Sequence, residues 1–153
     1  MADSSLAGVE LLGIDHVGIA VSDLDEAIDF YESTFGMRCV HREVNEEQGV
    51  AEAMLFVGPA GAGAQIQLLA PLTPDSTVAK FLDRRGPGMQ QIAYRVADVD
   101  TVCEALRARG VRLLYDTPRR GTGGSRVNFV HPKDAGGVLV ELVEPAARHT
   151  TAR

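Results

Sequence analysis

Four polar side chains that can bind a metal ion interrupt strand-like apolar runs of this chain, and they are His16, Gln67, Gln91 and Glu141. One imidazole, one carboxylate and two amide oxygens form a predominantly oxygen-donor set. Such a set suits an octahedral ion of the Co, Mn, Mg or Ni type better than structural zinc, which prefers thiolate and imidazole in a tetrahedron. Because neutral amides bind weakly, coordination positions would stay open for substrate or water, and the ion would act as a Lewis acid.

An internal repeat pairs these four residues. The segment HVGIAVSDLD, which begins at His16, aligns with QIAYRVADVD, which begins at Gln91, at an offset of 75 (91 minus 16). The segment QLLAP, which begins at Gln67, aligns with ELVEP, which begins at Glu141, at an offset of 74 (141 minus 67). If a pseudo-twofold axis relates the two halves, the two matched pairs converge on one point, as a single metal site requires.

Each of these residues has a simpler interpretation when it is taken alone. His16 can be a core imidazole bonded to a backbone carbonyl, and Gln67, like the nearby Gln65, can face solvent from a strand. Glu141 differs because its neighbours in the segment VLVELV are apolar, and a buried carboxylate needs a cation or a strong donor. The repeat matches Gln67, and not Gln65, with Glu141, so the four residues together favour the metal site.

Hydrophobic periodicity predicts a strand, a helix and three further strands in each half of the chain. Ile14–Val21 indicates a buried strand, Asp23 or the serine before it supplies an N-cap, and a helical apolar stripe follows as far as Gly36. The second half repeats these signals from Gln91 to Gly110. The remaining predicted strands are residues 37–44, 52–57, 65–69, 111–115, 127–130 and 138–143.

These elements predict an α+β fold in which two tandem βαβββ modules form a curved mixed sheet around the metal site. A single domain is expected, with a helix that links the modules and with flexible ends that carry no sustained apolar period. The expected boundaries are about 12–145 for the domain, 12–72 and 88–145 for the modules, 76–83 for the linking helix, and 1–11 and 146–153 for the flexible ends.

Composition excludes several classes of function. The net charge of −6 and the absence of a basic block beyond two Arg-Arg pairs argue against a nucleic-acid-binding protein. No apolar run approaches the ~20 residues of a membrane span, and the first residues have no secretory pattern. Cys39 and Cys103 lie far apart among apolar neighbours, which indicates reduced core thiols and, with the other features, a cytoplasmic protein.

Seven blocks of the sequence occur in an order that is typical of one protein family. They are Ile14–Ala20, Asn45–Glu52, Asp75–Leu82, Gly110–Asp116, Pro118–Gly121, Ser125–Lys133 and Gly137–Leu142. These blocks resemble the methylmalonyl-CoA epimerase family of the vicinal oxygen chelate superfamily. The resemblance covers about residues 12–145, so it is far more specific than a short motif.

The resemblance implies a dimeric enzyme that interconverts (2R)- and (2S)-methylmalonyl-CoA with a divalent ion, most typically Co²⁺, with Mn²⁺, Mg²⁺ or Ni²⁺ as alternatives. The metal ligands of the family map onto the four residues that the repeat pairs. One departure affects the metal: the family commonly has a His-His dipeptide where this chain has Gln90-Gln91. The second of those histidines is the usual ligand, so Gln91 leaves the identity and affinity of the ion open.

The resemblance also nominates residues for proton transfer and for coenzyme A. Inversion needs acid/base groups on both faces of the substrate, and the family match implies Glu52 as one base and Glu141 as both ligand and opposing base. The simpler interpretation of Glu52 is a solvated residue at the start of a strand. The phosphates of coenzyme A could meet basic residues in or beside a glycine-rich turn, which could equally be a solvated charged loop; these residues are Arg119, Arg120, Arg126 and Lys133.

Other functions also fit the predicted scaffold. A glutathione-dependent glyoxalase is one, and a metal-free protein that sequesters small molecules is another. A ring-cleaving dioxygenase needs two histidines and one carboxylate, whereas only His16 occurs among the mapped positions. A sequestering protein would leave the burial of Glu141 unexplained.

Overall fold

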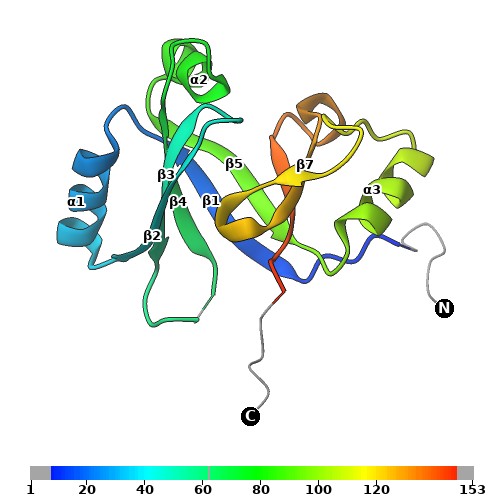
Figure 1. Cartoon of the computed structure of the whole chain (residues 1–153), viewed down its shortest axis with the longest axis horizontal. Helices are drawn as coiled ribbons and strands as arrows, with labels where there is room; N and C mark the ends of the chain where they lie inside the picture. The colour runs from blue at the N-terminus through cyan, green and yellow to red at the C-terminus, as the bar shows by residue number, and fades with distance from the viewer. Residues whose placement is uncertain (1–7, 62, 148–153) are drawn as a thin grey trace. The chain divides into compact units, whose positions relative to one another are not determined.

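The computed structural model describes residues 8–61 and 63–147 (Figure 1). Its α-helices begin where the sequence places a capping side chain. Asp23 and Asp98 accept hydrogen bonds from the backbone N–H groups of Glu26 and Thr101 at the two matched helix starts. Strand, helix and three strands occur twice, so the α+β class and the tandem βαβββ order are confirmed. The elements are β1 (Gly13–Ala20), α1 (Leu24–Phe35), β2 (Arg38–Asn45), β3 (Val50–Phe56), β4 (Gln65–Pro71), α2 (Thr77–Arg85), β5 (Gly88–Arg95), α3 (Val99–Ala108), β6 (Arg119–Arg120), β7 (Arg126–Val130) and β8 (Val140–Glu144).

The chain divides into two compact units whose boundary does not follow the sequence repeat. One unit is Gly13–Ala93, and the other begins at Tyr94 and includes residues 8–12 of the described chain. Most of β5, the first strand of the second module, therefore belongs to the unit that the first module builds. This gives the Gly13–Ala93 unit five strands, in the order β2-β3-β4-β1-β5.

Helix α1 covers one face of the sheet in the Gly13–Ala93 unit (Figure 1). Its Ile28 packs with Val21 and with alternate residues of two strands, among them Ala53 of β3 and Leu68 of β4. Because successive strand residues point to opposite faces, the residues before these, Glu52 and Gln67, point away from α1. β1 runs parallel to β4, and the pairs β2–β3 and β3–β4 are antiparallel.

Helix α2 packs against the face that α1 leaves uncovered. Its Val78 forms an apolar cluster with Ala20, Val50 and Leu69, and Phe81 packs against the same cluster. The helix runs over Thr77–Arg85, close to the expected 76–83, with Ser76 as its N-cap. The apolar cluster at α2 therefore borders the polar residues that lie farther along this face.

In the second unit, α3 packs against the antiparallel pair β7–β8. Val99 and Cys103 of the helix lie in a buried cluster with Val130 and Leu142. Burial raises the pKa of the Cys103 thiol. Cys103 and Cys39 are both free cysteines, and the structure buries Cys103 in the core but Cys39 only in part.

The strand expected at residues 111–115 is wrong. That segment has only one isolated bridge, between Leu113 and Val130, and the short strand beside β7 is β6 instead. The fully buried Asn128 explains the difference, because its side chain replaces the missing strand ladder. Its Oδ1 accepts from the Tyr115 N–H at 3.1 Å, and its Nδ2 donates to the Tyr115 carbonyl at 2.9 Å.

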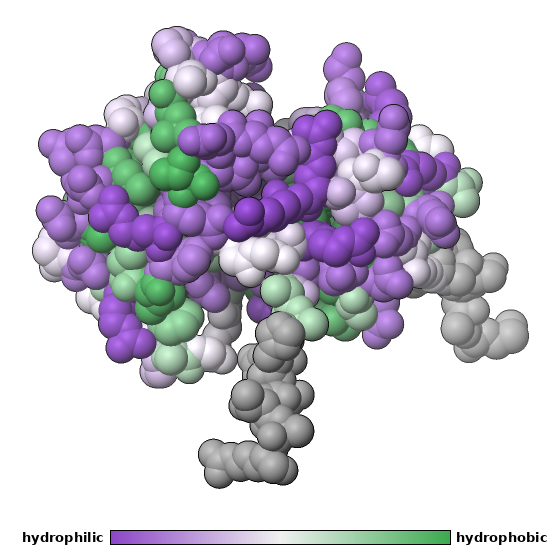
Figure 2. Space-filling view, in the orientation of Figure 1, coloured by the Kyte–Doolittle hydropathy of each residue, from purple (hydrophilic) through white to green (hydrophobic). Residues whose placement is uncertain are grey.

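Exposed apolar side chains are scattered among hydrophilic ones on the face shown in Figure 2. Residues 1–7 and 148–153, most of the ends expected to be flexible, lie outside the described residues. Leu12 is held by a hydrogen bond from its N–H to the Arg95 carbonyl. None of the helices in the described ranges is long and apolar enough to cross a membrane.

Candidate active site

A row of polar side chains, of which three are buried and Gln91 is half-buried, lies on the face of the Gly13–Ala93 unit that is opposite α1. It consists of Glu52 on β3, Gln67 on β4, His16 on β1 and Gln91 on β5, four strands that are neighbours in the sheet. The exposed fractions of His16, Glu52 and Gln67 are each 3%. The solvent-facing interpretations of Gln67 and Glu52 are therefore wrong, and the sheet brings residues far apart in sequence onto one surface.

Hydrogen bonds connect three of these side chains in series. Gln67 Nε2 donates to Glu52 Oε2 at 3.0 Å, and Gln91 Nε2 donates to Gln67 Oε1 at 3.3 Å. An ionised carboxylate can only accept hydrogen bonds, so Glu52 holds the NH₂ group of Gln67 on its own side. The amide oxygen of Gln67 is thereby turned toward Gln91.

Asp15 orients the imidazole of His16. His16 Nδ1 lies 2.7 Å from Asp15 Oδ2, and with the carboxylate ionised and the imidazole neutral, Nδ1 carries the proton and donates it to this bond. Nε2 then carries the lone pair, which is the form of histidine that binds a metal ion. Histidine ligands of metal sites commonly donate their other ring N–H to a carboxylate in this way. Sequence reasoning missed Asp15, although it directly precedes His16.

The donor types along this row match those that a hard divalent ion accepts. They are one oriented imidazole and amide oxygens beside a buried carboxylate, which is a set that octahedral ions accept. In the described ranges, no group of three or more His, Cys, Asp or Glu side chains has an arrangement that could hold a metal ion. This donor set therefore differs from a site built of His, Cys, Asp and Glu alone, because it includes the amide oxygens of Gln67 and Gln91.

Glu141 lies in the second unit, on β8 opposite Phe129 of β7. Its exposed fraction is 6%, and its neighbours Leu142 and Val143 are buried apolar residues. This burial agrees with the expectation from its apolar sequence context. Its role as a ligand or base stays a prediction.

The basic residues nominated for coenzyme A differ in their surroundings. Arg119 and Arg120 are exposed on β6, and the Arg119 guanidinium lies 4.0 Å from the centroid of the Tyr115 ring. Arg126 pairs with two carboxylates, Asp100 at 2.9 Å and Glu144 at 3.5 Å, and the bond to Asp100 is the main cause that raises its pKa. Lys133 is exposed in a short 3₁₀ turn after β7.

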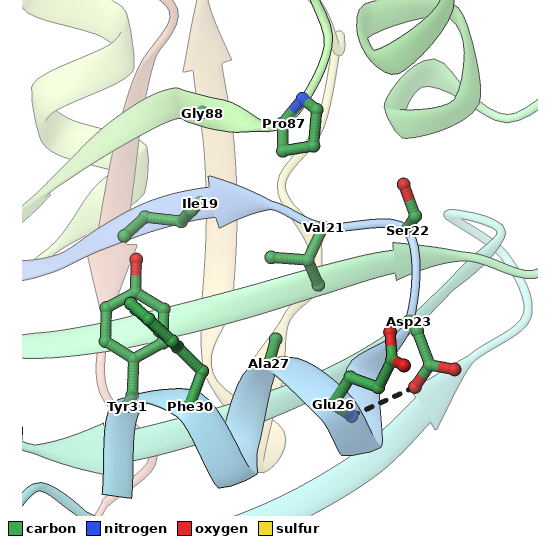
Figure 3. A pocket seen from close by; sticks show the side chains of 10 residues that line it. All are labelled: Ile19, Val21, Ser22, Asp23, Glu26, Ala27, Phe30, Tyr31, Pro87 and Gly88. Atoms are coloured by element: carbon green, nitrogen blue, oxygen red, sulfur yellow. Dashed lines mark hydrogen bonds between the residues drawn. The ribbon is translucent and has the colours of Figure 1, made fainter. Parts of the chain in front are cut away.

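A cavity of about 480 Å³ lies on the other face of the sheet, between α1 and β1. Figure 3 shows Phe30 and Tyr31 of α1 on one side and Ile19 of β1 on the other. Strand alternation separates Ile19 from Gly18, which lies on the face of the polar row. The cavity is therefore distinct from the polar row.

Comparison with known proteins identifies the family. Residues 15–129 match the model of the Glyoxalase/Bleomycin resistance protein/Dioxygenase superfamily. The mitochondrial methylmalonyl-CoA epimerase of Homo sapiens is 35% identical over 130 residues, which cover 84% of this chain and 72% of the human protein. The chain belongs to the methylmalonyl-CoA epimerase family. The family resemblance found in the sequence is thereby confirmed.

Solved structures of methylmalonyl-CoA epimerases have the same fold. The Mycobacterium tuberculosis enzyme is 58% identical, with a TM-score of 0.87 and coverage of 99% of this chain and 97% of that chain. A variant of the Streptomyces coelicolor enzyme in complex with 2-nitronate-propionyl-CoA is 51% identical, with a TM-score of 0.86 and coverage of 90% and 100%. The chain is accordingly an isomerase of the epimerase class.

Proposed function

We propose that this chain interconverts (2R)- and (2S)-methylmalonyl-CoA by removing the proton alpha to the thioester and returning it to the opposite face. The observation that carries this proposal is the buried Glu52 carboxylate, bonded at 3.0 Å to a glutamine whose oxygen faces a second glutamine. A glyoxalase-like reaction is the alternative on the same scaffold.

Glu52 takes the proton from one face of the substrate. A carboxylate that is 3% exposed meets little competing water, and a fixed neighbour such as Gln67 limits the orientations that it adopts. The second acid/base group is Glu141, assigned from the family resemblance. Two carboxylates would thus serve the two epimers, one from each face of the planar enolate.

His16, Gln67, Gln91 and Glu141 would hold a divalent ion, with Glu141 assigned from the sequence repeat. Co²⁺ is the proposed ion, and Mn²⁺, Mg²⁺ and Ni²⁺ are the alternatives. When bound, the ion would supply Lewis-acid stabilisation of the negative charge that develops on the thioester oxygen. Asp15 and Glu52 contribute by holding His16 and Gln67 in ligating orientations.

The phosphates of coenzyme A would meet basic residues of the second unit. Exposure makes Arg119, Arg120 and Lys133 accessible to an anion. Arg126 is the weakest of the four, because phosphate would compete with Asp100 and Glu144 for its guanidinium. We further propose a homodimer, from the family resemblance, and a cytoplasmic location, from the unpaired cysteines.

Proton exchange with solvent tests the reaction. Metal-depleted protein that receives Co²⁺ in D₂O should incorporate deuterium at the alpha carbon of methylmalonyl-CoA, whereas chelated protein should not. Mass spectrometry of recovered substrate measures the label, and propionyl-CoA, which lacks the second carboxylate, is the control substrate. Absence of exchange with Co²⁺ at protein concentrations far above catalytic would contradict the proposal.

A further inference from the structure

Gly18 occupies the centre of β1 although its backbone does not require glycine. It is absent from the glycines with positive φ, so any residue could adopt its conformation. The repeat also places Ala93, which is fully buried on β5, at the matching position 75 residues later (93 minus 18). A side chain is thus tolerated at the equivalent point of the other module, and the reason for glycine must lie in the surroundings of β1.

The Gln91 side chain fills the space above Gly18. A Cβ atom placed on Gly18 would lie 2.5 Å from Cγ and 3.1 Å from Cδ of Gln91, with Leu69 Cδ1 next at 3.2 Å. Cγ is the near end of the glutamine side chain, so it can retreat only by rotation about χ1. That rotation would carry the whole amide away from its present position.

The position of the Gln91 amide depends on this space. Gly18 is the register partner of Gln67 across β1 and β4, and Gln91 reaches over it to donate from Nε2 to Gln67 Oε1 at 3.3 Å. We infer that Gly18 is a positioning residue, whose missing side chain admits Gln91 to the row and sets its amide beside that of Gln67. The inference rests on the proposed function to the extent that these amides are metal ligands.

Metal affinity tests the consequence for the site. Gly18→Ala should weaken Co²⁺ binding, measured by calorimetry on metal-depleted protein, by about tenfold or more, the range typical of residues that orient ligands. Gly88→Ala is the matched control, because Gly88 lies on β5 with no atom within 4 Å of an added Cβ. The Co²⁺ affinity of Gly88→Ala should match that of the parent protein. Unchanged affinity in Gly18→Ala, with the parent protein binding Co²⁺, would overturn the inference.

A double-mutant cycle without metal tests the contact itself. Gly18→Ala should lower the melting temperature when Gln91 is present and should have little effect in a Gln91→Ala background, where the space is open. If Gly18→Ala lowered the melting temperature equally in both backgrounds, the added Cβ would clash with Leu69 and not with Gln91, and the inference would be overturned. If Gly18→Ala does not fold, recovery in the double variant supports it. Failure of the parent protein to bind Co²⁺ would contradict the proposed metal site, and this cycle would still decide the role of Gly18.

Discussion

Glu52 has two partners in the proposed chemistry, the substrate proton and the Gln67 amide. The 3.0 Å bond that it accepts from Gln67 Nε2 decides which end of that amide is the oxygen. A glutamine at position 52 would keep an acceptor for Gln67 and lose the capacity to take a proton at neutral pH. The two roles can therefore be separated by one substitution.

Glu52→Gln should fold, bind Co²⁺ within a few-fold of the parent affinity, and lose alpha-proton exchange by about 10²-fold or more, as expected for removal of a general base. Deuterium incorporation and calorimetry measure the two effects. Glu46→Gln, in the exposed turn after β2, is the control and should exchange at the parent rate. Parent-like exchange in Glu52→Gln would remove this residue from the base role.

At the scale of elements, the sequence predicts the helices, because caps and apolar stripes are local signals. The caps at Asp23 and Asp98 and the apolar stripes after them locate α1 and α3 within a few residues. The segment 111–115 has strand-like composition, but it makes one isolated bridge to β7, and beyond that bridge the Asn128 side chain bonds the Tyr115 backbone. Such a replacement depends on a tertiary contact and has no period in the sequence, so pattern reasoning could not find it.

The same segment is anchored by an ion pair with the turn after β7. Arg112 donates from Nε, Nη2 and its backbone N to the Asp134 carboxylate, all within 2.9 Å. These bonds hold the pKa of Asp134 well below its ordinary value, and the side-chain bonds are the largest cause. Because the folded pKa is depressed, the stabilisation is complete above the unfolded pKa of about 4 and is lost as pH falls below it.

Urea unfolding of the parent and of Asp134→Asn should therefore differ by a constant free energy between pH 7 and 5. The difference should shrink below about pH 4, where the unfolded chain of the parent takes up the proton first. Asp29→Asn, on the exposed face of α1, provides a control that should track the parent. A difference that grows with acidification would contradict this assignment.

At the scale of the whole molecule, the repeat predicts residues of the polar row, but it does not predict the neighbouring residues that orient them. It nominates Gln67 and Gln91, which the sheet brings into hydrogen-bond contact, and their roles as ligands stay predictions. The requirement for Gly18 and the contact between Asp15 and His16 were not predicted. Both features depend on the direction in which a side chain points on its strand, and the spacing of residues in the sequence does not specify that direction.

The proposed homodimer can be tested on the intact protein. We expect multi-angle light scattering to give twice the chain mass of 16.3 kDa at micromolar concentration. Large apolar side chains such as Met89 and Phe35 are 76% and 61% exposed in the single chain, and association would remove such surface from water. A mass of one chain across the same concentration range would contradict the dimer.

The placement of Gln91 over Gly18 also constrains the order in which the chain can fold. The strands β1 to β4 can pair once residue 71 has been synthesised, but the space above Gly18 stays unfilled until β5 docks beside β1. The two contacting residues are 73 positions apart (91 minus 18), so closing that loop carries an entropic cost, which the packing of α2 on Ala20 and Leu69 offsets in part. A nascent chain that ends before β5 can therefore hold a sheet, but it cannot hold the row of amides, and the last strand to join the unit completes it.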